Sequence, residues 1–168
     1  RRFEVRVVGG DSGSYVSFVL GATCFGFAGK GRLLRRNAAC EGQVLCLAGP
    51  AGRCRAAQKA YLEAAKTQVS TEVAKRLLSN WQRPNPPVKF GAWLGEKALA
   101  FAAQDTSDGL GNAISDICEQ SGVSIELKDI GDIVDRDVQH VADCFDVPAL
   151  DLALSVSPDF GLLFSTDV

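Results

Sequence analysis

Residues 98–122 constrain the fold more than any other part of the sequence. Small residues at 98–104 predict a strand, and the polar run Asp105-Thr106-Ser107-Asp108-Gly109 separates it from a stretch with helical periodicity. Gly122 stands where such a helix would end. The apolar positions fall on one helix face: Leu110, Ala113, Ile114, Ile117 and Cys118. Because an apolar helix face must be covered by another layer, the segment predicts a layered domain.

The rest of the chain mixes helices and strands without a regular βαβ repeat. Ser70 is placed as the N-cap of one helix, and Arg83-Pro84-Asn85-Pro86-Pro87 ends it. This irregular order favours an α+β fold with a mixed or antiparallel sheet and helices packed on it. Further strands are predicted at 3–8, 15–28, 43–47, 123–127 and 161–165, and helices at 53–67, 71–81, 91–97 and 135–145.

Composition excludes several classes of function. The 168 residues are 46% hydrophobic and 23% charged, with a net charge of −2, as in ordinary globular domains. We expect no nucleic-acid partner because a basic bias is absent, and no membrane partner because no apolar run approaches roughly 18 residues. The six cysteines are irregularly spaced and none forms a C-x-x-C pair. Reduced thiols in a cytoplasmic protein are therefore favoured over disulfides or structural zinc.

Other titratable groups give no catalytic constellation. The single histidine, His140, lies in a polar helical stretch and is interpreted as a solvated surface residue. No serine or cysteine motif accompanies it, so a catalytic triad cannot be assembled. A set of acids is interpreted as a solvated face: Asp132, Asp135, Asp137, Asp143 and Asp146.

The run Asp105-Thr106-Ser107-Asp108-Gly109 has two interpretations. Its carboxylates and hydroxyls are hard oxygen ligands of the kind that Mg²⁺ takes together with substrate phosphates, and a helix start adds free N–H groups that favour anions. Phosphoryl transfer needs both. The alternative is simple helix capping, because Ser and Asp are preferred N-caps.

Two other loops carry weaker signals. Gly9-Gly10-Asp11 follows a predicted strand, where glycine permits close approach of a ligand and the acid could hold a metal, but a hairpin turn explains it equally well. In the basic loop 29–43, Arg35 or Arg36 could contact a nucleotide phosphate, or the loop could simply be solvated.

In order along the chain, these segments resemble thiamine-monophosphate kinases, members of the aminoimidazole-ribonucleotide-synthetase-like superfamily. Val7-Val8-Gly9-Gly10-Asp11-Ser12 is similar to VGGDT, and Arg83-Pro84-Asn85-Pro86 to R-P-x-P. Asp105–Leu110 matches D-x-S-D-G-L, a form that distinguishes this family within its superfamily. The remaining matches are the R-S-G-A-x-x-G-D loop at 36–43, the Y-V-T-G-x-L-G turn at 44–52 and the E-D-Y-E-L-L-F-T end at 159–164.

The resemblance implies ATP-dependent phosphorylation of thiamine monophosphate to the diphosphate with Mg²⁺. It places Asp11, Asp105 and Asp108 on Mg²⁺. It places Gly10, Asp11, Arg36 and Ser107 on ATP, with Arg35 as the fallback for Arg36. It further implies that residues 1–30 are a remnant of the N-terminal ATP- and Mg²⁺-binding domain. Residues 31–168 would be the C-terminal domain, truncated at its end.

The chain also departs from the family pattern. The upstream acids and glycine-rich segment of the family are missing, so we expect little kinase activity from these residues alone. The missing half also carries the family's dimer contact, and a homodimer is expected of the intact form. Pro158 stands where the family has a substrate-contacting Glu. Two alternatives therefore stay open: a non-catalytic scaffold or binding relative, and a superfamily enzyme that uses ATP on another phosphorylated substrate.

Overall fold

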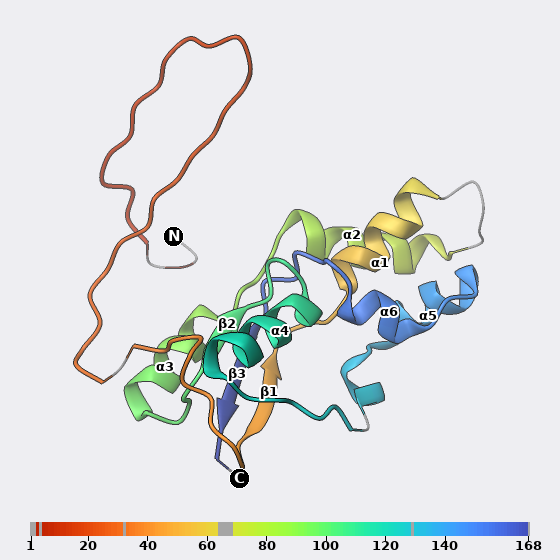
Figure 1. Cartoon of the computed structure of the whole chain (residues 1–168). Coiled ribbons are helices and arrows are strands. Elements are labelled where there is room, and N and C mark those ends of the chain that lie inside the picture. The colour runs from red at the N-terminus through yellow and green to blue at the C-terminus, as the bar shows by residue number, and fades with distance from the viewer. Residues whose placement is uncertain (1–2, 4, 32, 64–68, 129, 168) are drawn as a thin grey trace.

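A computed structural model describes residues 3, 5–31, 33–63, 69–128 and 130–167 (Figure 1). Its centre is a three-stranded sheet in the order β1-β3-β2, with β3 antiparallel to both neighbours. The strands are β1 (Val44–Ala48), β2 (Ala103–Asp105) and β3 (Leu162–Thr166). The register pairs Cys46 and Ala103 with Phe164 from opposite sides. The predicted α+β class with an antiparallel sheet is confirmed.

The two faces of the sheet are covered by different helices. Because neighbouring side chains of a strand point to opposite faces, Leu163 and Phe164 enter separate clusters. Leu163 packs with α4 (Leu110–Ser121), whose residues Ala113 and Ile117 are buried. Phe164 packs with Leu94 of α3 (Val88–Lys97). The sheet is thus enclosed in three layers, which places the end of β2 between α3 and α4.

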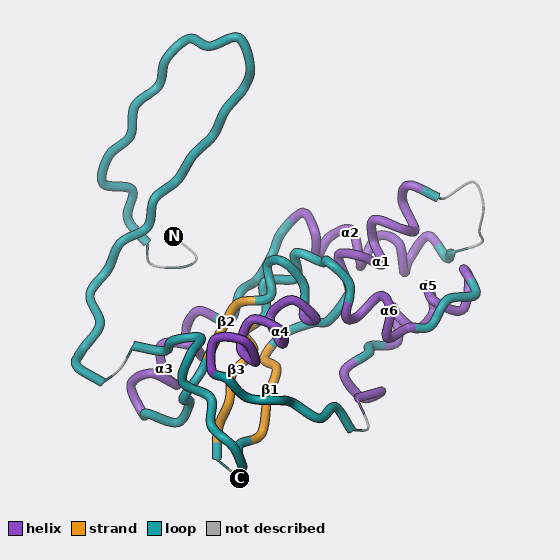
Figure 2. Tube along the Cα trace, in the orientation of Figure 1, coloured by secondary structure: helices purple, strands orange, loops and turns teal. Residues whose placement is uncertain are grey.

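Four more helices form a second core beside one end of the sheet (Figure 2). Its fully buried residues include Ala56, Leu77, Val138 and Val141. Ser70 caps its helix as predicted, because its hydroxyl accepts a hydrogen bond from the backbone N–H of Val73 (3.3 Å). The helices are α1 (Arg53–Leu62), α2 (Thr71–Gln82), α5 (Arg136–Phe145) and α6 (Ala149–Leu154).

Charged side chains connect three of these helices, and this corrects the interpretation of two acids as solvated. Asp135 caps α5 by accepting from the N–H groups of Asp137 and Val138 (2.9 and 3.0 Å). Asp137 accepts two hydrogen bonds from the Arg76 guanidinium, from Nε (2.9 Å) and from an Nη (2.6 Å). These bonds hold the pKa of Asp137 below its usual value. Arg53 on α1 reaches both acids (3.0 and 3.3 Å).

His140 differs from its expected state as well. It is half-buried, and its Nε2 lies 3.7 Å from the Cys144 sulfur one turn along α5. Both residues lie on the same helix face because they are four positions apart. His140 is therefore a partly buried residue of the helix surface rather than a freely solvated one.

Most predicted helices and strands after residue 43 are confirmed, with shifts of a few residues at their ends. The helix predicted over 53–67 ends at Leu62, and its residues 64–67 lie outside the described part. The small-residue strand predicted at 98–104 is much shorter, since β2 begins at Ala103. Two short elements were not predicted, α6 and a 3-10 helix, η2 (Ile130–Ile133). Among the described helices, none is long and apolar enough to cross a membrane.

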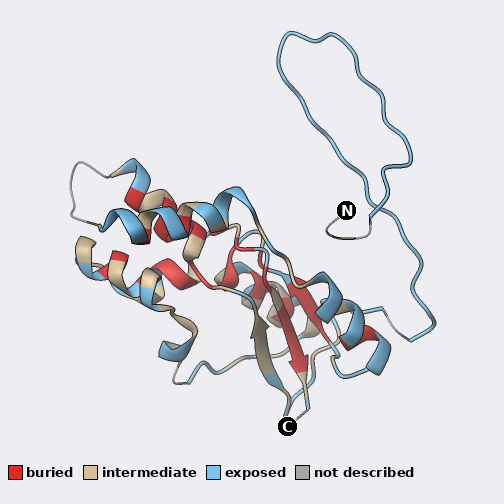
Figure 3. Ribbon diagram, turned by 180° about the vertical axis from the view of Figure 1, so that it is seen from behind, coloured by how far each residue is buried: buried red, intermediate tan, exposed pale blue. Residues whose placement is uncertain are grey.

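Three predicted strands are wrong. The described residues of 3–8 and all of 15–28 form an irregular chain segment, and every residue from 5 to 31 is exposed (Figure 3). Residues 123–127 run beside the core without joining the sheet. Periodicity and β-branched residues indicate strand propensity, but a strand forms only where a neighbour completes its hydrogen bonds. No described segment pairs with these three.

Candidate functional site at the junction of β2 and α4

The predicted polar junction is an ordered turn at the edge of the sheet. Asp105 ends β2, and its carboxylate accepts a hydrogen bond from the N–H of Ser107 (3.3 Å). Thr106 is buried and exchanges two bonds with Gly161, whose N–H donates to the hydroxyl (2.9 Å) while the Thr106 N–H donates to its carbonyl (3.0 Å). Asp105 and Asp108 are both exposed. The turn is therefore anchored to the core through Thr106, whereas the carboxylates of Asp105 and Asp108 are exposed to solvent.

The loop that carries Arg36 is fixed by its backbone to β2 and to the end of α4. The N–H of Ala103 in β2 donates to the carbonyl of Arg35 (2.9 Å), and the Ser121 hydroxyl at the end of α4 donates to the carbonyl of Arg36 (3.0 Å). The same hydroxyl accepts from the N–H of Ala39 (3.1 Å). Two elements that are distant in sequence thus fix the loop on which Arg36 lies.

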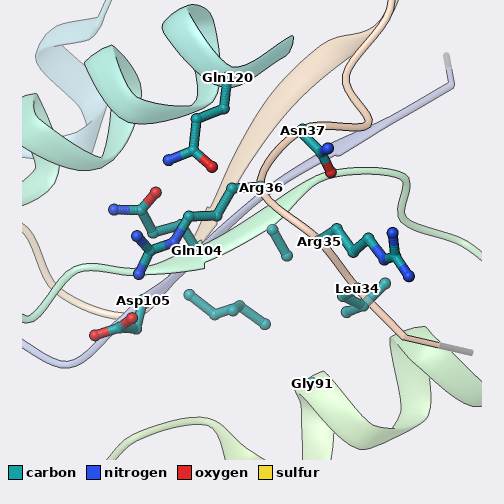
Figure 4. A pocket seen from close by; sticks show the side chains of 10 residues that line it. Leu34, Arg35, Arg36, Asn37, Gly91, Gln104, Asp105 and Gln120 are labelled. Carbon is teal, nitrogen blue, oxygen red and sulfur yellow. The ribbon is translucent and has the colours of Figure 1, made fainter. Parts of the chain in front are cut away.

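A pocket of about 540 Å³ lies between the Arg36 loop, β2, α3 and α4 (Figure 4). The Arg36 side chain extends into it toward Asp105, whereas Arg35 points away. The structure therefore favours Arg36 over Arg35 as the arginine that faces the junction. The pocket is lined by Leu34, Arg35, Arg36, Asn37, Gly91, Ala103, Gln104, Asp105, Gln120 and Leu162.

Two amide side chains of this pocket, Gln104 and Gln120, were missed by sequence reasoning. Gln104 is 7% exposed and donates from Nε2 to the Asp116 carboxylate on α4 (2.6 Å). Its Oε1 is buried and has no hydrogen-bond partner. The one signal in the sequence was a polar residue directly after two alanines in a buried strand. No motif marks either glutamine.

The structure does not bring Gly10 and Asp11 to this pocket. Both lie in the exposed segment from 5 to 31, which projects away from the domain (Figure 1). The Asp11 carboxylate accepts from the N–H of Ser12 (2.9 Å), and a Cβ added at Gly10 would meet no atom within 4 Å. Their assignment to ATP and Mg²⁺ stays a prediction.

The junction offers oxygen donors of the kind that Mg²⁺ takes. Asp105, Asp108 and the Ser107 hydroxyl supply hard oxygens, and Mg²⁺ commonly takes one or two carboxylates with waters and phosphate oxygens. In the described residues no three His, Cys, Asp or Glu side chains gather closely enough to hold a metal by themselves. The donor set thus fits a metal that a phosphate ligand helps to bind.

A second loop, 155–161, contacts the junction through Gly161 and is fixed to the N-terminus of α1. The Asp159 carboxylate accepts from the N–H groups of Gly52 (2.6 Å) and Cys54 (2.9 Å) and from the Ser157 hydroxyl (2.8 Å). Ser157 in turn accepts from the N–H of Arg55 (3.0 Å). These bonds satisfy donors that a helix start leaves free. Burial, aided by the nearby Asp159 carboxylate, raises the pKa of the Cys54 thiol to about 12.

Three glycines let other segments closely approach residues 152–155, at the end of α6 and the start of this loop. Gly52 and Gly109 have positive φ, 76° and 97°. A Cβ would lie 2.5 Å from the carbonyl oxygen of Leu152 if added at Gly52, and 2.4 Å from that of Ser155 if added at Gly109. At Gly111 a Cβ would lie 2.4 Å from the carbonyl oxygen of Leu154. In this loop, Pro158 is half-buried, and its carbonyl accepts from the Cys54 thiol (3.3 Å).

The sequence is similar to thiamine-monophosphate kinases over almost its whole length. It is 36% identical over 163 residues to the enzyme of Methanopyrus kandleri, covering 97% of this chain and 50% of that one. It is 29% identical over 126 residues to the enzyme of Bacillus subtilis, covering 74% and 38%. The chain thus spans about half the length, or less, of the curated relatives it matches. No protein-family model matches it.

Solved structures show the same fold. The thiamine-monophosphate kinase of Stenotrophomonas maltophilia superposes with a TM-score of 0.66 and 25% identity, covering 84% of this chain and 44% of that one. AaThiL complexed with AMPPCP and TMP superposes with a TM-score of 0.65 and 22% identity, covering 80% and 42%. The matched region thus covers less than half of each of these two chains.

Proposed function

Because this chain belongs to the thiamine-monophosphate kinase family and corresponds to its C-terminal part, we propose that it contributes the phosphate- and metal-binding edge of an ATP-dependent kinase. The acceptor in that reaction would be thiamine monophosphate, and the product thiamine diphosphate. The observation that carries the proposal is the convergence of Arg36 and Asp105 on one pocket beside Ser107 and Asp108.

Each residue of this edge has a role that its chemistry supports. The Arg36 guanidinium offers a planar fork of donors that matches phosphate oxygens. The Ser107 hydroxyl would contact ATP, while Asp105 and Asp108 would hold Mg²⁺, which neutralises phosphate charge when bound. One pocket is thus lined by both a cationic and an anionic side chain, as a site for an anionic nucleotide with a divalent cation requires.

The complete activity needs more than this edge. Gly10 and Asp11, predicted to touch ATP and Mg²⁺, are exposed and remote from the pocket. We propose that the missing half of the family architecture orders them, and that residues 1–168 alone have little kinase activity. A homodimer in the intact form, and a reducing cytoplasmic setting for the six free cysteines, belong to the same proposal.

Calorimetric titration with a non-hydrolysable ATP analogue, with and without Mg²⁺, tests this function. We expect Mg²⁺-dependent binding that Asp105→Asn and Asp108→Asn both abolish. Asp132→Asn is the matched control, because Asp132 is equally exposed but lies in η2, away from the pocket. If binding of the analogue does not depend on Mg²⁺, or if it persists in both Asp→Asn variants of the junction, the assignment of Asp105 and Asp108 to Mg²⁺ is refuted.

A second candidate rests on Pro158, which cannot ionise or donate a hydrogen bond. Since the family has a substrate-contacting Glu there, Pro158 favours either a non-catalytic binding relative or an enzyme that phosphorylates a different substrate. Measuring ADP release by the intact protein over a panel of phosphorylated substrates distinguishes the kinase, the enzyme with another substrate and the binding relative. Release with thiamine monophosphate supports the kinase, release only with another substrate supports the second enzyme, and no release supports the binding protein.

A further inference from the structure

The side chain of Gln104 is oriented by Asp116, and this fixes the position of its free oxygen. An ionised carboxylate can only accept hydrogen bonds, so the 2.6 Å contact with Asp116 must be made by the amide nitrogen. The amide oxygen is therefore on the side away from Asp116. It is a buried acceptor with no partner, on a residue that lines the pocket.

A buried acceptor without a partner is unfavourable, so its surroundings indicate what it is arranged to bind. Two residues with donor groups line the same pocket, Arg36 with its guanidinium and Gln120 with its amide (Figure 4). Within the described part of the chain, no hydrogen bond or ion pair reaches the Arg36 guanidinium. An unpaired donor fork and an unpaired acceptor thus line the same pocket.

We propose that Gln104 is a positioning residue for the anion site. When an anion enters the pocket, the Gln104 Oε1, which has no partner in this structure, accepts a hydrogen bond from Arg36 and turns the remaining N–H groups of the guanidinium toward the phosphate ligand. The inference rests on the proposed function of Arg36.

The neutrality of Gln104 is what suits it to this task. Arg36 also points toward Asp105, and an arginine next to a carboxylate tends to form a bidentate ion pair. Such an ion pair would leave neither the Arg36 guanidinium free to bind the anion nor the Asp105 carboxylate free to bind the cation. An amide oxygen orients the guanidinium without neutralising it, so Arg36 keeps its charge for phosphate and Asp105 stays free for Mg²⁺.

Gln120 is the competing donor for the same oxygen. It is exposed and lies one turn after Asp116 on α4. If Gln120 satisfied Gln104, the two amides would form a neutral pair with no effect on the anion. Replacement of each glutamine by methionine, which is similar in length and has no amide, distinguishes the two arrangements.

The test is a titration of the full chain with tripolyphosphate in the absence of metal. We expect Gln104→Met to weaken binding by about tenfold, as for loss of one hydrogen bond to a charged group. In the Arg36→Met background the same substitution should have no further effect, and Gln120→Met should leave affinity unchanged. Equal weakening by Gln104→Met with and without Arg36, or loss of affinity in Gln120→Met, would overturn the proposal.

A measurement on the Arg36 side chain itself separates this proposal from the proposed function. At saturating tripolyphosphate, the Nε–H signal of Arg36 in NMR spectra should show slow guanidinium rotation in the wild type and faster rotation in Gln104→Met. The paired exchange Gln104→Glu with Asp116→Asn keeps one amide, one carboxylate and their hydrogen bond, and it should restore slow rotation. If tripolyphosphate does not bind the wild type, the anion role of Arg36 fails. Equal rotation in the wild type and Gln104→Met refutes the role of Gln104 itself.

Discussion

Asp159→Asn should destabilise the domain by removing half of a buried cap. The Asp159 carboxylate accepts from Gly52, Cys54 and Ser157 with both of its oxygens. An amide of the same shape keeps one oxygen and turns its NH₂ toward at least one backbone donor. Loss of a hydrogen bond to a charged group costs about 1.5–3 kcal/mol, and loss of the charge at a helix N-terminus adds about 0.3–1 kcal/mol. We therefore expect a decrease of about 2–4 kcal/mol in the free energy of unfolding.

Urea denaturation followed by circular dichroism measures this change, because the dependence on urea concentration should keep its slope while the midpoint falls. Asp132→Asn makes the same chemical change at an exposed position and should stay within about 0.5 kcal/mol of the wild type. If Asp159→Asn also stays within that range, the carboxylate contributes no net stability and the physical account of the loop is wrong.

Three further perturbations have defined outcomes. Gly109→Ala should lower the free energy of unfolding by about 2 kcal/mol or more in thermal denaturation, because φ is 97° and the new methyl group would meet the carbonyl oxygen of Ser155. The stability that Asp137 gains from Arg76 is present above about pH 4 and is lost as pH falls through its lowered pKa, so Arg76→Met should flatten this part of the pH profile of unfolding. At pH 8, iodoacetamide followed by mass spectrometry should label exposed Cys40 before Cys54, whose thiol pKa is about 12.

Each of these perturbations has a matched control. Gly131→Ala places a methyl group where no atom lies within 4 Å, and it should be tolerated. Lys75→Met removes an exposed partner of Glu72 (3.8 Å) and should leave the pH profile unchanged. Urea should bring Cys54 to the labelling rate of Cys40. Tolerance of Gly109→Ala, an unchanged profile in Arg76→Met, or equal labelling of both thiols in the native state would contradict the respective argument.

The parts of the fold that could be predicted are those with local signals. Ser70 and Gly122 mark helix ends within a few residues of the positions they control, and both were identified. The strands at 15–28 and 123–127 were wrong because strand formation depends on a partner that periodicity does not reveal. Residues of the candidate site could likewise be predicted only where a local sequence motif marks them. Asp105 was found from its motif, whereas the role of Asp159 rests on contacts with residues more than 100 positions away.

The glycines around the loop 155–161 determine which of its positions can change during evolution without altering the backbone. Gly52, Gly109 and Gly111 fix the route of residues 152–157 because they have no side chains, and Asp159 anchors the route beyond them. The backbone thus depends on residues other than Pro158, which contributes its carbonyl to the contact with Cys54. A substitution at position 158 therefore changes the side chain there while the loop keeps its course. Sequence changes at this one position can thus accumulate one at a time without loss of the fold.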